Sequence, residues 1–144
     1  MRHILFICSG NFYRSRFAEA VFNSHASQRR LPIRAFSRGL ATHLVFGEGV
    51  LSPFTRIALA ARGIALNHTG PQPVQLARAD LERAHRVIAL KEAEHRPLMR
   101  QLFPDWETRI EYWVVHDLDA AAPDVAIPQL ERHVLALLDA YARA

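Results

Sequence analysis

The chain has 144 residues, of which 50% are hydrophobic and 22% are charged, and its formal net charge is +4. This length and composition suit one soluble globular domain over residues 1–144 and exclude a disordered chain. No apolar run approaches the ~18 residues that cross a bilayer. We therefore expect no membrane insertion. The scattered arginines lack interleaved aromatic residues, so we expect no nucleic-acid binding either.

The first half of the chain predicts two strands and two helices. The opening strand is a short apolar run that ends at Ser9 and Gly10, and the second helix has Pro53 in its first turn and Gly63 at its end. The predicted elements are a strand over His3–Cys8, a helix from Ser15 to about Arg30, a strand over Ile33–Ser37, a loop over Leu40–Gly49 and a helix from about Ser52 to Arg62.

The second half alternates in the same way, and Pro97 is expected to distort one of its helices. The predicted elements are an irregular segment over Asn67–Gln75, a helix over Asp80–His85, a strand over Arg86–Leu90, a helix over Glu92–Leu102, a strand over Ile110–Val115 and a helix over Pro128–Ala142. Strands that alternate with helices predict a three-layer α/β fold, in which a four-stranded parallel sheet carries helices on both faces.

Cys8, the only cysteine of the chain, stands at the end of the first strand. Ligands of parallel α/β sheets bind beyond the carboxyl ends of the strands, so this is the expected position of the site. A single cysteine excludes an internal disulfide and a multi-cysteine metal site, and the eight histidines lack clustered spacing. We therefore expect no metal and no cofactor.

The residues after Cys8 have the properties of a phosphate-binding loop. Backbone amides around Gly10 and Asn11 can form an anion-binding nest, and the next helix adds the positive end of its dipole. The same field favours the thiolate of Cys8. Arg14 can bind two phosphate oxygens at once, and Ser15 can donate to the sulfur as it leaves. On the Cys-x5-Arg spacing alone, a buried cysteine beside a solvated arginine remains an alternative.

The opening motif resembles the N-terminal signature of the low-molecular-weight protein tyrosine phosphatases, and the resemblance extends weakly over the whole chain. The motif reads Ile4-Leu5-Phe6-Ile7-Cys8-Ser9-Gly10-Asn11-Phe12-Tyr13-Arg14-Ser15. The resemblance implies that Cys8 is the nucleophile of a phosphocysteine intermediate and that Arg14 binds phosphate and stabilises the transition state. It implies that the phosphate lies against Ser9, Gly10, Asn11, Phe12, Tyr13, Arg14 and Ser15.

Three further positions match the family one by one. The resemblance implies that Asn11 braces the loop, that Ser37 supports the loop through hydrogen bonds, and that His68 bonds to the loop asparagine. On the residues alone, Asn11 is also an ordinary turn residue, Ser37 a strand-end cap and His68 a surface histidine, so both interpretations stay open.

An aspartate near the C-terminus supplies the leaving-group proton in this family, usually within an Asp-Pro pair. Asp117 follows the predicted fourth strand directly, at the edge of the sheet where Cys8 lies, and a partly desolvated carboxyl there has the raised pKa that a general acid requires. Asp119 is the alternative acid, because Leu118 replaces the usual proline and leaves the register open.

The chain also departs from the family pattern. Tyr13 stands where many members have a second cysteine, so Cys8 lacks an internal disulfide partner. Arg16 replaces the usual proline, and it either adds charge near the mouth of the site or faces solvent. The usual tyrosines after the acid are missing, so the aromatic wall is expected from Phe12, Tyr13, Phe46 or Trp113.

These observations favour a cytoplasmic cysteine-dependent phosphatase. Its expected substrate is a phosphotyrosyl protein or a small aryl phosphomonoester, with inorganic phosphate as product. One alternative is a binding module for phosphate or phosphoproteins that lacks a working acid. An arsenate reductase is disfavoured, because that class of this fold needs additional cysteines to pass on the oxidising equivalent.

Overall fold

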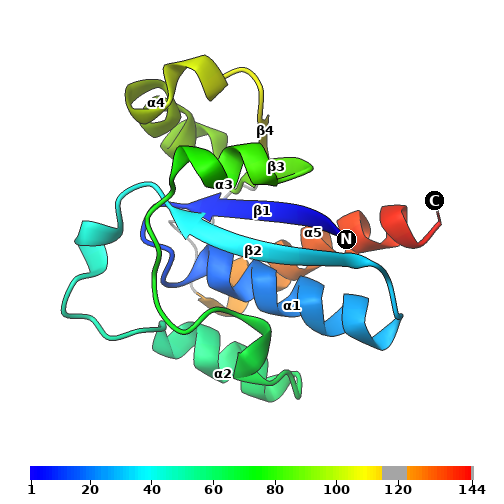
Figure 1. The fold of residues 1–144 in the computed structure, drawn as a ribbon. Coiled ribbons are helices and arrows are strands. Elements are labelled where there is room, and N and C mark those ends of the chain that lie inside the picture. Colours follow the sequence, from blue (N-terminus) through cyan, green and yellow to red (C-terminus); the bar gives the residue numbers. More distant parts are fainter. Residues whose placement is uncertain (115–122, 144) are drawn as a thin grey trace.

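The computed structural model describes residues 1–114 and 123–143, and in these ranges four parallel strands form one sheet. The strands are β1 (Arg2–Cys8), β2 (Ile33–Gly39), β3 (Arg86–Ala89) and β4 (Glu111–Tyr112), in the spatial order β2-β1-β3-β4 (Figure 1). β1 is therefore a central strand, and its carboxyl end, with Cys8, lies between the ends of β2 and β3.

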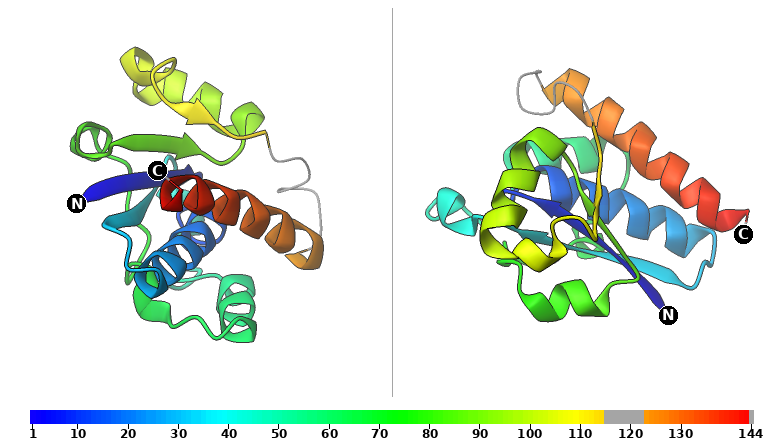
Figure 2. Two further views of the ribbon diagram at one scale, coloured as in Figure 1. Left: turned by 90° about the vertical axis from the view of Figure 1, so that its right-hand side faces the viewer. Right: turned by 90° about the horizontal axis from the view of Figure 1, so that it is seen from above.

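Helices cover both faces of the sheet. On one face lie α1 (Arg14–Gln28), α2 (Pro53–Ala61) and α5 (Pro123–Ala142), with α1 and α5 side by side (Figure 2). On the other face lie α3 (Arg78–Arg83) and α4 (Glu92–Leu102). The described residues also form three short 3-10 helices, which are η1 (Thr42–Val45), η2 (Leu66–His68) and η3 (Pro104–Trp106). The predicted three-layer α/β fold is confirmed.

The alternation along β1 explains the two layers of core. Ile4 and Phe6 point into the cluster with α1 and α5, whereas Leu5 and Ile7 point into the cluster with α3 and α4. All four side chains are 0% exposed. Because successive side chains of a strand face opposite sides, a strand buried on both faces reads as the continuous apolar run seen in the sequence.

Several predicted boundaries are wrong. The fourth strand was expected over Ile110–Val115, but β4 spans only Glu111–Tyr112. The last helix begins at Pro123 rather than Pro128. Pro128 and Pro97 both lie in the second turn of their helices, where a proline removes one backbone hydrogen bond without ending the helix. The predicted loop over Leu40–Gly49 contains η1.

Two features link the sheet to the loop after β1. Gly39, the last residue of β2, pairs with Cys8, and a Cβ atom at Gly39 would lie 2.7 Å from the backbone oxygen of Ser9. The loop after Cys8 therefore packs against a position that has room only for glycine.

Within the described residues, no helix has the length and apolar character needed to cross a membrane.

Candidate active site: the loop between β1 and α1

The loop between β1 and α1 forms the floor of a small cavity of about 210 Å³. Cys8 is 2% exposed at the end of β1, and α1 begins six residues later at Arg14. Asn11 has a φ of 52°, a left-handed conformation that asparagine tolerates better than most residues. The cavity is lined by Cys8, Ser9, Gly10, Phe12, Tyr13, Arg14, Leu44 and Val45. The Cys8 thiol, the Arg14 guanidinium and the N-terminus of α1 therefore lie at one opening.

The Cys8 sulfur lies 2.9 Å from the Ser15 hydroxyl oxygen, and both groups are buried. The Nδ2 group of Asn11 donates to the same Ser15 oxygen over 2.9 Å. The Ser15 oxygen therefore accepts from Asn11 and shares a second hydrogen bond with the sulfur, in which either group can be the donor. When Ser15 is the donor, its proton lies against the sulfur, which is the atom that acts as the nucleophile in cysteine enzymes.

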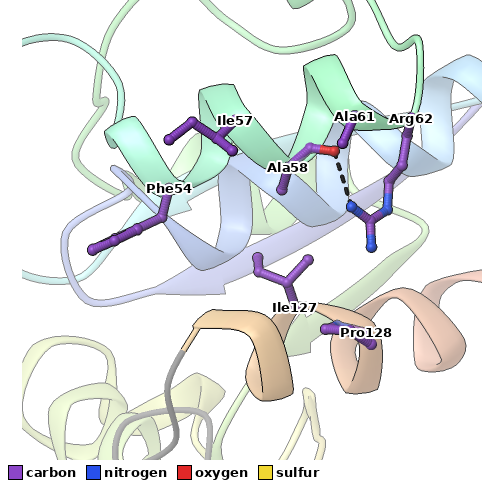
Figure 3. A pocket seen from close by; sticks show the side chains of 7 residues that line it. All are labelled: Phe54, Ile57, Ala58, Ala61, Arg62, Ile127 and Pro128. Atoms are coloured by element: carbon purple, nitrogen blue, oxygen red, sulfur yellow. Dashed lines mark hydrogen bonds between the residues drawn. The ribbon is translucent and has the colours of Figure 1, made fainter.

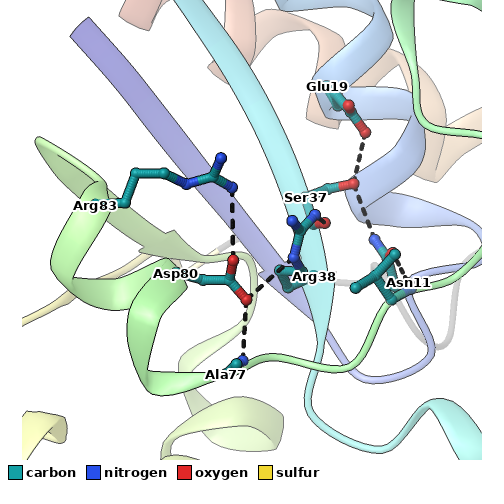
Figure 4. Close-up of polar contacts among 8 residues, drawn as sticks. Asn11, Glu19, Ser37, Arg38, Ala77, Asp80 and Arg83 are labelled. Atoms are coloured by element: carbon teal, nitrogen blue, oxygen red, sulfur yellow. Dashed lines mark hydrogen bonds and ion pairs between the residues drawn. The ribbon is translucent and has the colours of Figure 1, made fainter.

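Asn11 connects the loop to β2 and to the segment before α3. Its Nδ2 group also donates to the Ser37 hydroxyl over 2.9 Å, and its Oδ1 atom accepts from the backbone N–H of Val74 over 2.9 Å. Ser37 in turn donates to Glu19 of α1 over 2.6 Å (Figure 4). Asn11 is 1% exposed and Ser37 is 3% exposed, so water does not compete for these bonds.

The expected contact between His68 and Asn11 is absent among the described residues. The backbone oxygen of His68 accepts from Asn23, and the neighbouring residue, Thr69, reaches the buried network instead. Thr69 donates to Glu19 over 2.9 Å. Burial raises the pKa of Glu19 above its usual range, while the Ser37 and Thr69 hydroxyls oppose that shift.

Both positions predicted for Arg16 are wrong, because the side chain lies neither at the mouth of the cavity nor in solvent. The residue is 2% exposed. Its Nε atom donates to the Thr69 hydroxyl over 2.7 Å, and its two Nη groups donate to backbone oxygens of Asn11, Val50 and Gly70. Burial lowers the pKa of Arg16 from its ordinary value, and Glu19 opposes that shift. Arg16 thus ties the loop between β1 and α1 to two other loops.

Arg14 is held by a carboxylate that the sequence analysis did not identify. Its Nη1 and Nη2 groups donate to the two oxygens of Glu94 over 2.7 and 2.9 Å, and Ser9 also donates to Glu94 over 2.8 Å. The hydrogen bonds from Arg14 lower the pKa of Glu94 to about 2, although partial burial opposes them. Glu94 is therefore ionised at neutral pH and fixes the plane of the guanidinium.

His95 lies directly behind Glu94 and is 0% exposed. Its Nδ1 atom accepts from the backbone N–H of Lys91 over 3.0 Å, so Nε2 carries the proton of the neutral ring. Burial first, and Arg14 second, lower the pKa of His95 to about 4. Nε2 has no hydrogen-bond partner in the described structure, and it lies 3.9 Å from the Glu94 carboxylate.

A second carboxylate, Asp80, supports the end of β2 beside Ser37. Its oxygens bind Arg38 over 3.1 Å and Arg83 over 3.5 Å, and accept from the backbone N–H of Ala77 over 3.0 Å (Figure 4). Asp80 thereby caps α3 and joins it to β2. This assembly lies next to the loop network and stabilises the strand that carries Ser37.

The remaining predicted residues divide into three groups. Phe12 and Tyr13 line the cavity, together with Leu44 and Val45 of η1, which the sequence analysis did not single out. Trp113 packs against the core instead, with its ring 5.9 Å from that of Phe6, and Phe46 is 77% exposed. Asp117 and Asp119 lie outside the described residues. No group of three potential metal ligands occurs in the described ranges.

Fold and site together define a class of protein. A parallel α/β sheet that presents a cysteine, an arginine and a helix N-terminus in one loop has the construction of a cysteine-dependent phosphatase. The family model for low molecular weight phosphotyrosine protein phosphatase matches residues 3–134, and the chain belongs to this family. The resemblance carried by the opening motif is confirmed.

Individual relatives differ in their stated activity. A protein-arginine-phosphatase of Bacillus subtilis (strain 168) is 31% identical over 108 residues, which are 74% of this chain and 67% of the relative. The structure of a low molecular weight protein tyrosine phosphatase from T. tengcongensis aligns with a TM-score of 0.74 at 21% identity, over 96% of each chain. The YwlE arginine phosphatase of Geobacillus stearothermophilus aligns with a TM-score of 0.73 at 21% identity, over 99% of this chain and 94% of that one. The two structural alignments show a shared fold.

Proposed function

We propose that this phosphatase hydrolyses phosphotyrosine in proteins, or small aryl phosphates, through a phosphocysteine formed on Cys8. The observation that carries the proposal is the hydrogen bond of 2.9 Å between Cys8 and Ser15 in the loop that ends at Arg14. It joins a buried sulfur to a buried hydroxyl group that can donate to it, beside a guanidinium that Glu94 holds in place. These groups complement a phosphoryl oxyanion above the sulfur.

The first chemical step transfers the phosphoryl group to sulfur. The Cys8 thiolate attacks phosphorus, the bond from phosphorus to the aryl oxygen breaks, and that oxygen takes a proton from Asp117, or from Asp119 in the alternative assignment. Arg14 and the loop amides bind the phosphoryl oxygens while charge develops on them.

In the second step, water attacks phosphorus and its proton returns to the aspartate. The phosphorus–sulfur bond breaks, inorganic phosphate leaves, and Ser15 stabilises the departing thiolate. The cycle ends with the thiolate and the protonated aspartate restored, so no metal or cofactor takes part in the proposed reaction.

The lining of the cavity supports an aryl substrate. Phe12, Tyr13, Leu44 and Val45 surround the opening with apolar and aromatic surface. A phenyl ring buries apolar area against such a wall, whereas a guanidinium needs acceptors for its N–H groups. Among the described residues that line the cavity, none is a carboxylate.

Phosphoarginine in proteins is the second candidate substrate, because the relative that is 31% identical is a protein-arginine-phosphatase. The same loop can transfer a phosphoryl group from nitrogen, with the aspartate protonating the guanidine that leaves. A binding module would keep the loop and Arg14 without turnover. Arsenate reduction is disfavoured, because the sequence holds only Cys8 as a thiol.

A comparison of substrates tests the proposal. The purified protein is incubated with p-nitrophenyl phosphate, a phosphotyrosine peptide and a matched phosphoarginine peptide between pH 5 and 8, and released phosphate is measured. We expect kcat/KM to be highest for the phosphotyrosine peptide and turnover to vanish in Cys8→Ser. A preference for phosphoarginine would replace the aryl assignment with the second candidate. Phosphate binding without turnover of any substrate would establish the binding module.

A further inference from the structure

A second hollow lies beside the phosphate cavity, between α2 and α5 (Figure 3). This groove has a volume of about 400 Å³. Among the described residues, its lining is apolar except for one arginine and comprises Phe54, Ile57, Ala58, Ala61, Arg62, Ile127 and Pro128. The proposed reaction, which concerns only the phosphoryl group and its leaving oxygen, does not use this groove.

The exposure of its side chains suits an apolar occupant. Phe54 is 53% exposed and Ile57 is 67% exposed, although both are large hydrophobic residues at the rim. The floor is continuous with the core, because Ala58 and Ile127 are only 9% and 4% exposed. Large apolar side chains exposed around such a floor indicate a binding surface more strongly than isolated ones do.

Arg62, the one charged residue that the structure describes in the groove, is paired with a carboxylate. Arg62 donates from Nε and Nη2 to the two oxygens of Glu131 over 2.8 and 3.1 Å, and from Nη1 to the Ala58 carbonyl over 2.9 Å. Its guanidinium is therefore engaged with protein acceptors at one end of the groove. This lining therefore favours a neutral hydrocarbon side chain as the occupant, and not an anion.

The groove and the phosphate cavity share a wall. The Tyr13 ring lines the cavity, the Phe54 ring lines the groove, and the two ring centroids lie 5.9 Å apart. The start of α2 is bonded to the loop, since Ser52 donates its backbone N–H to the Phe12 carbonyl over 3.0 Å and Thr55 donates its hydroxyl to the Tyr13 carbonyl over 3.0 Å. These bonds hold the start of α2 against the loop, so the distance between the groove and the phosphate cavity is fixed by the fold.

We propose that the groove binds an apolar side chain of the protein substrate, a few residues away from the phosphorylated residue that enters the cavity over Cys8. This inference rests on the proposed function, because it assigns a protein as the substrate. An extended peptide advances ~3.3 Å per residue, so two to four residues span about 7–13 Å, enough to cross the pair of rings. Leucine, isoleucine or methionine suits the lining.

Peptide kinetics test this assignment. A polar phosphotyrosine peptide is compared with peptides that carry one leucine at each position within four residues of the phosphotyrosine. At one or two positions we expect KM to fall about tenfold, as partial burial of one leucine side chain implies. The advantage should disappear in Ile57→Gln, which makes the rim polar, and in Ala61→Phe, which fills the groove. Both residues are exposed, so neither change disturbs the core.

Matched controls separate this inference from the proposed function. Leu102→Gln alters an exposed leucine of α4, and it should retain the full leucine advantage. Hydrolysis of p-nitrophenyl phosphate should be unchanged in all three variants, because that substrate does not reach the groove. If the wild-type protein fails to hydrolyse it, the proposed function falls, and binding of the same peptides to Cys8→Ser still tests the groove.

Two results would overturn the inference. One is a KM that is insensitive to leucine at every position, or an advantage that survives in both Ile57→Gln and Ala61→Phe. The other is a dimer in sedimentation experiments that dissociates in Ile57→Gln, which would assign the groove to a second copy of the chain.

Discussion

Glu94 holds Arg14 through two parallel hydrogen bonds of 2.7 and 2.9 Å, although 80 positions separate the two residues in the sequence. The pair joins the start of α1 to the first turn of α4, across the carboxyl ends of β1 and β3. Because Arg14 is the only cation among the described residues that line the cavity, the proposed function makes its orientation decisive for binding the phosphoryl oxyanion. Glu94 is thus a positioning residue for Arg14.

The first prediction concerns this pair. Glu94→Gln keeps the shape of the side chain but removes its charge and one of its two acceptors for Arg14, so we expect kcat to fall about tenfold, the value of one charge-assisted hydrogen bond. The measurement is steady-state hydrolysis of p-nitrophenyl phosphate. Glu92→Gln is the control, because Glu92 pairs with Arg96 on the outer side of the same helix. A kcat within twofold of wild type in Glu94→Gln would contradict the positioning role.

The second prediction concerns the buried cation. Arg16→Met keeps the length of the side chain but leaves the carbonyls of Asn11, Val50 and Gly70 without their donor. We expect the free energy of unfolding to fall by about 3–5 kcal/mol, measured by urea denaturation. The exposed Arg132 provides the control, and Arg132→Met should change it by less than ~0.5 kcal/mol. A loss below ~1 kcal/mol in Arg16→Met would show that the buried bonds carry little stability.

The third prediction is a pH dependence of stability caused by His95. Its pKa falls from an ordinary value of 6.5 to about 4 in the folded state, so the unfolded chain binds the proton first as pH decreases. The stabilising contribution is therefore complete above pH 6.5 and is lost as pH falls toward 4. A shift of this size corresponds to about 3 kcal/mol.

Urea denaturation at several pH values between 4 and 7 measures this contribution. His95→Asn retains an acceptor for the Lys91 N–H but cannot titrate, so the difference between wild type and variant should shrink as pH falls. A difference that is constant over this range would remove His95 as the cause.

The fourth prediction assigns the general acid. Asp117→Asn should lower kcat/KM for phenyl phosphate, which reports the transfer of the phosphoryl group to sulfur, by about 10²–10³, because a poor leaving group needs the proton. The loss should be smaller for p-nitrophenyl phosphate, whose leaving group departs without much assistance. Asp119→Asn should leave both rates close to wild type. The opposite pattern, with the large loss in Asp119→Asn, would transfer the acid role to Asp119.

The local part of the site could be predicted from the sequence. Cys8, Asn11, Arg14 and Ser15 belong to one short motif after an apolar run, and the alternation of strands and helices indicates where the ends of the strands meet. The role of Ser37 was inferred from the resemblance to the family, because its position at the end of a strand also fits a simple cap. Motif residues carry this information because their spacing and the adjacent elements constrain the backbone directly.

The long-range part of the site could not be predicted from the sequence. Glu94 reaches Arg14 because β3 lies beside β1, and this order of strands is a tertiary property that no local pattern contains. Arg16 looked like a surface residue because a buried arginine is recognised only by acceptors from distant loops, here around Val50 and Gly70. Thr69 contacts the buried network in the place expected for His68. In an irregular segment, a shift of one residue along the chain changes which side chain points inward.

The most direct test of the proposed mechanism is chemical trapping of the phosphocysteine intermediate. The enzyme is mixed with p-nitrophenyl phosphate, quenched in acid within milliseconds, digested and analysed by mass spectrometry. We expect one phosphoryl group on the peptide that contains Cys8, and its absence in Cys8→Ala. A phosphoryl group on another residue, or continued turnover by Cys8→Ser, would contradict the mechanism.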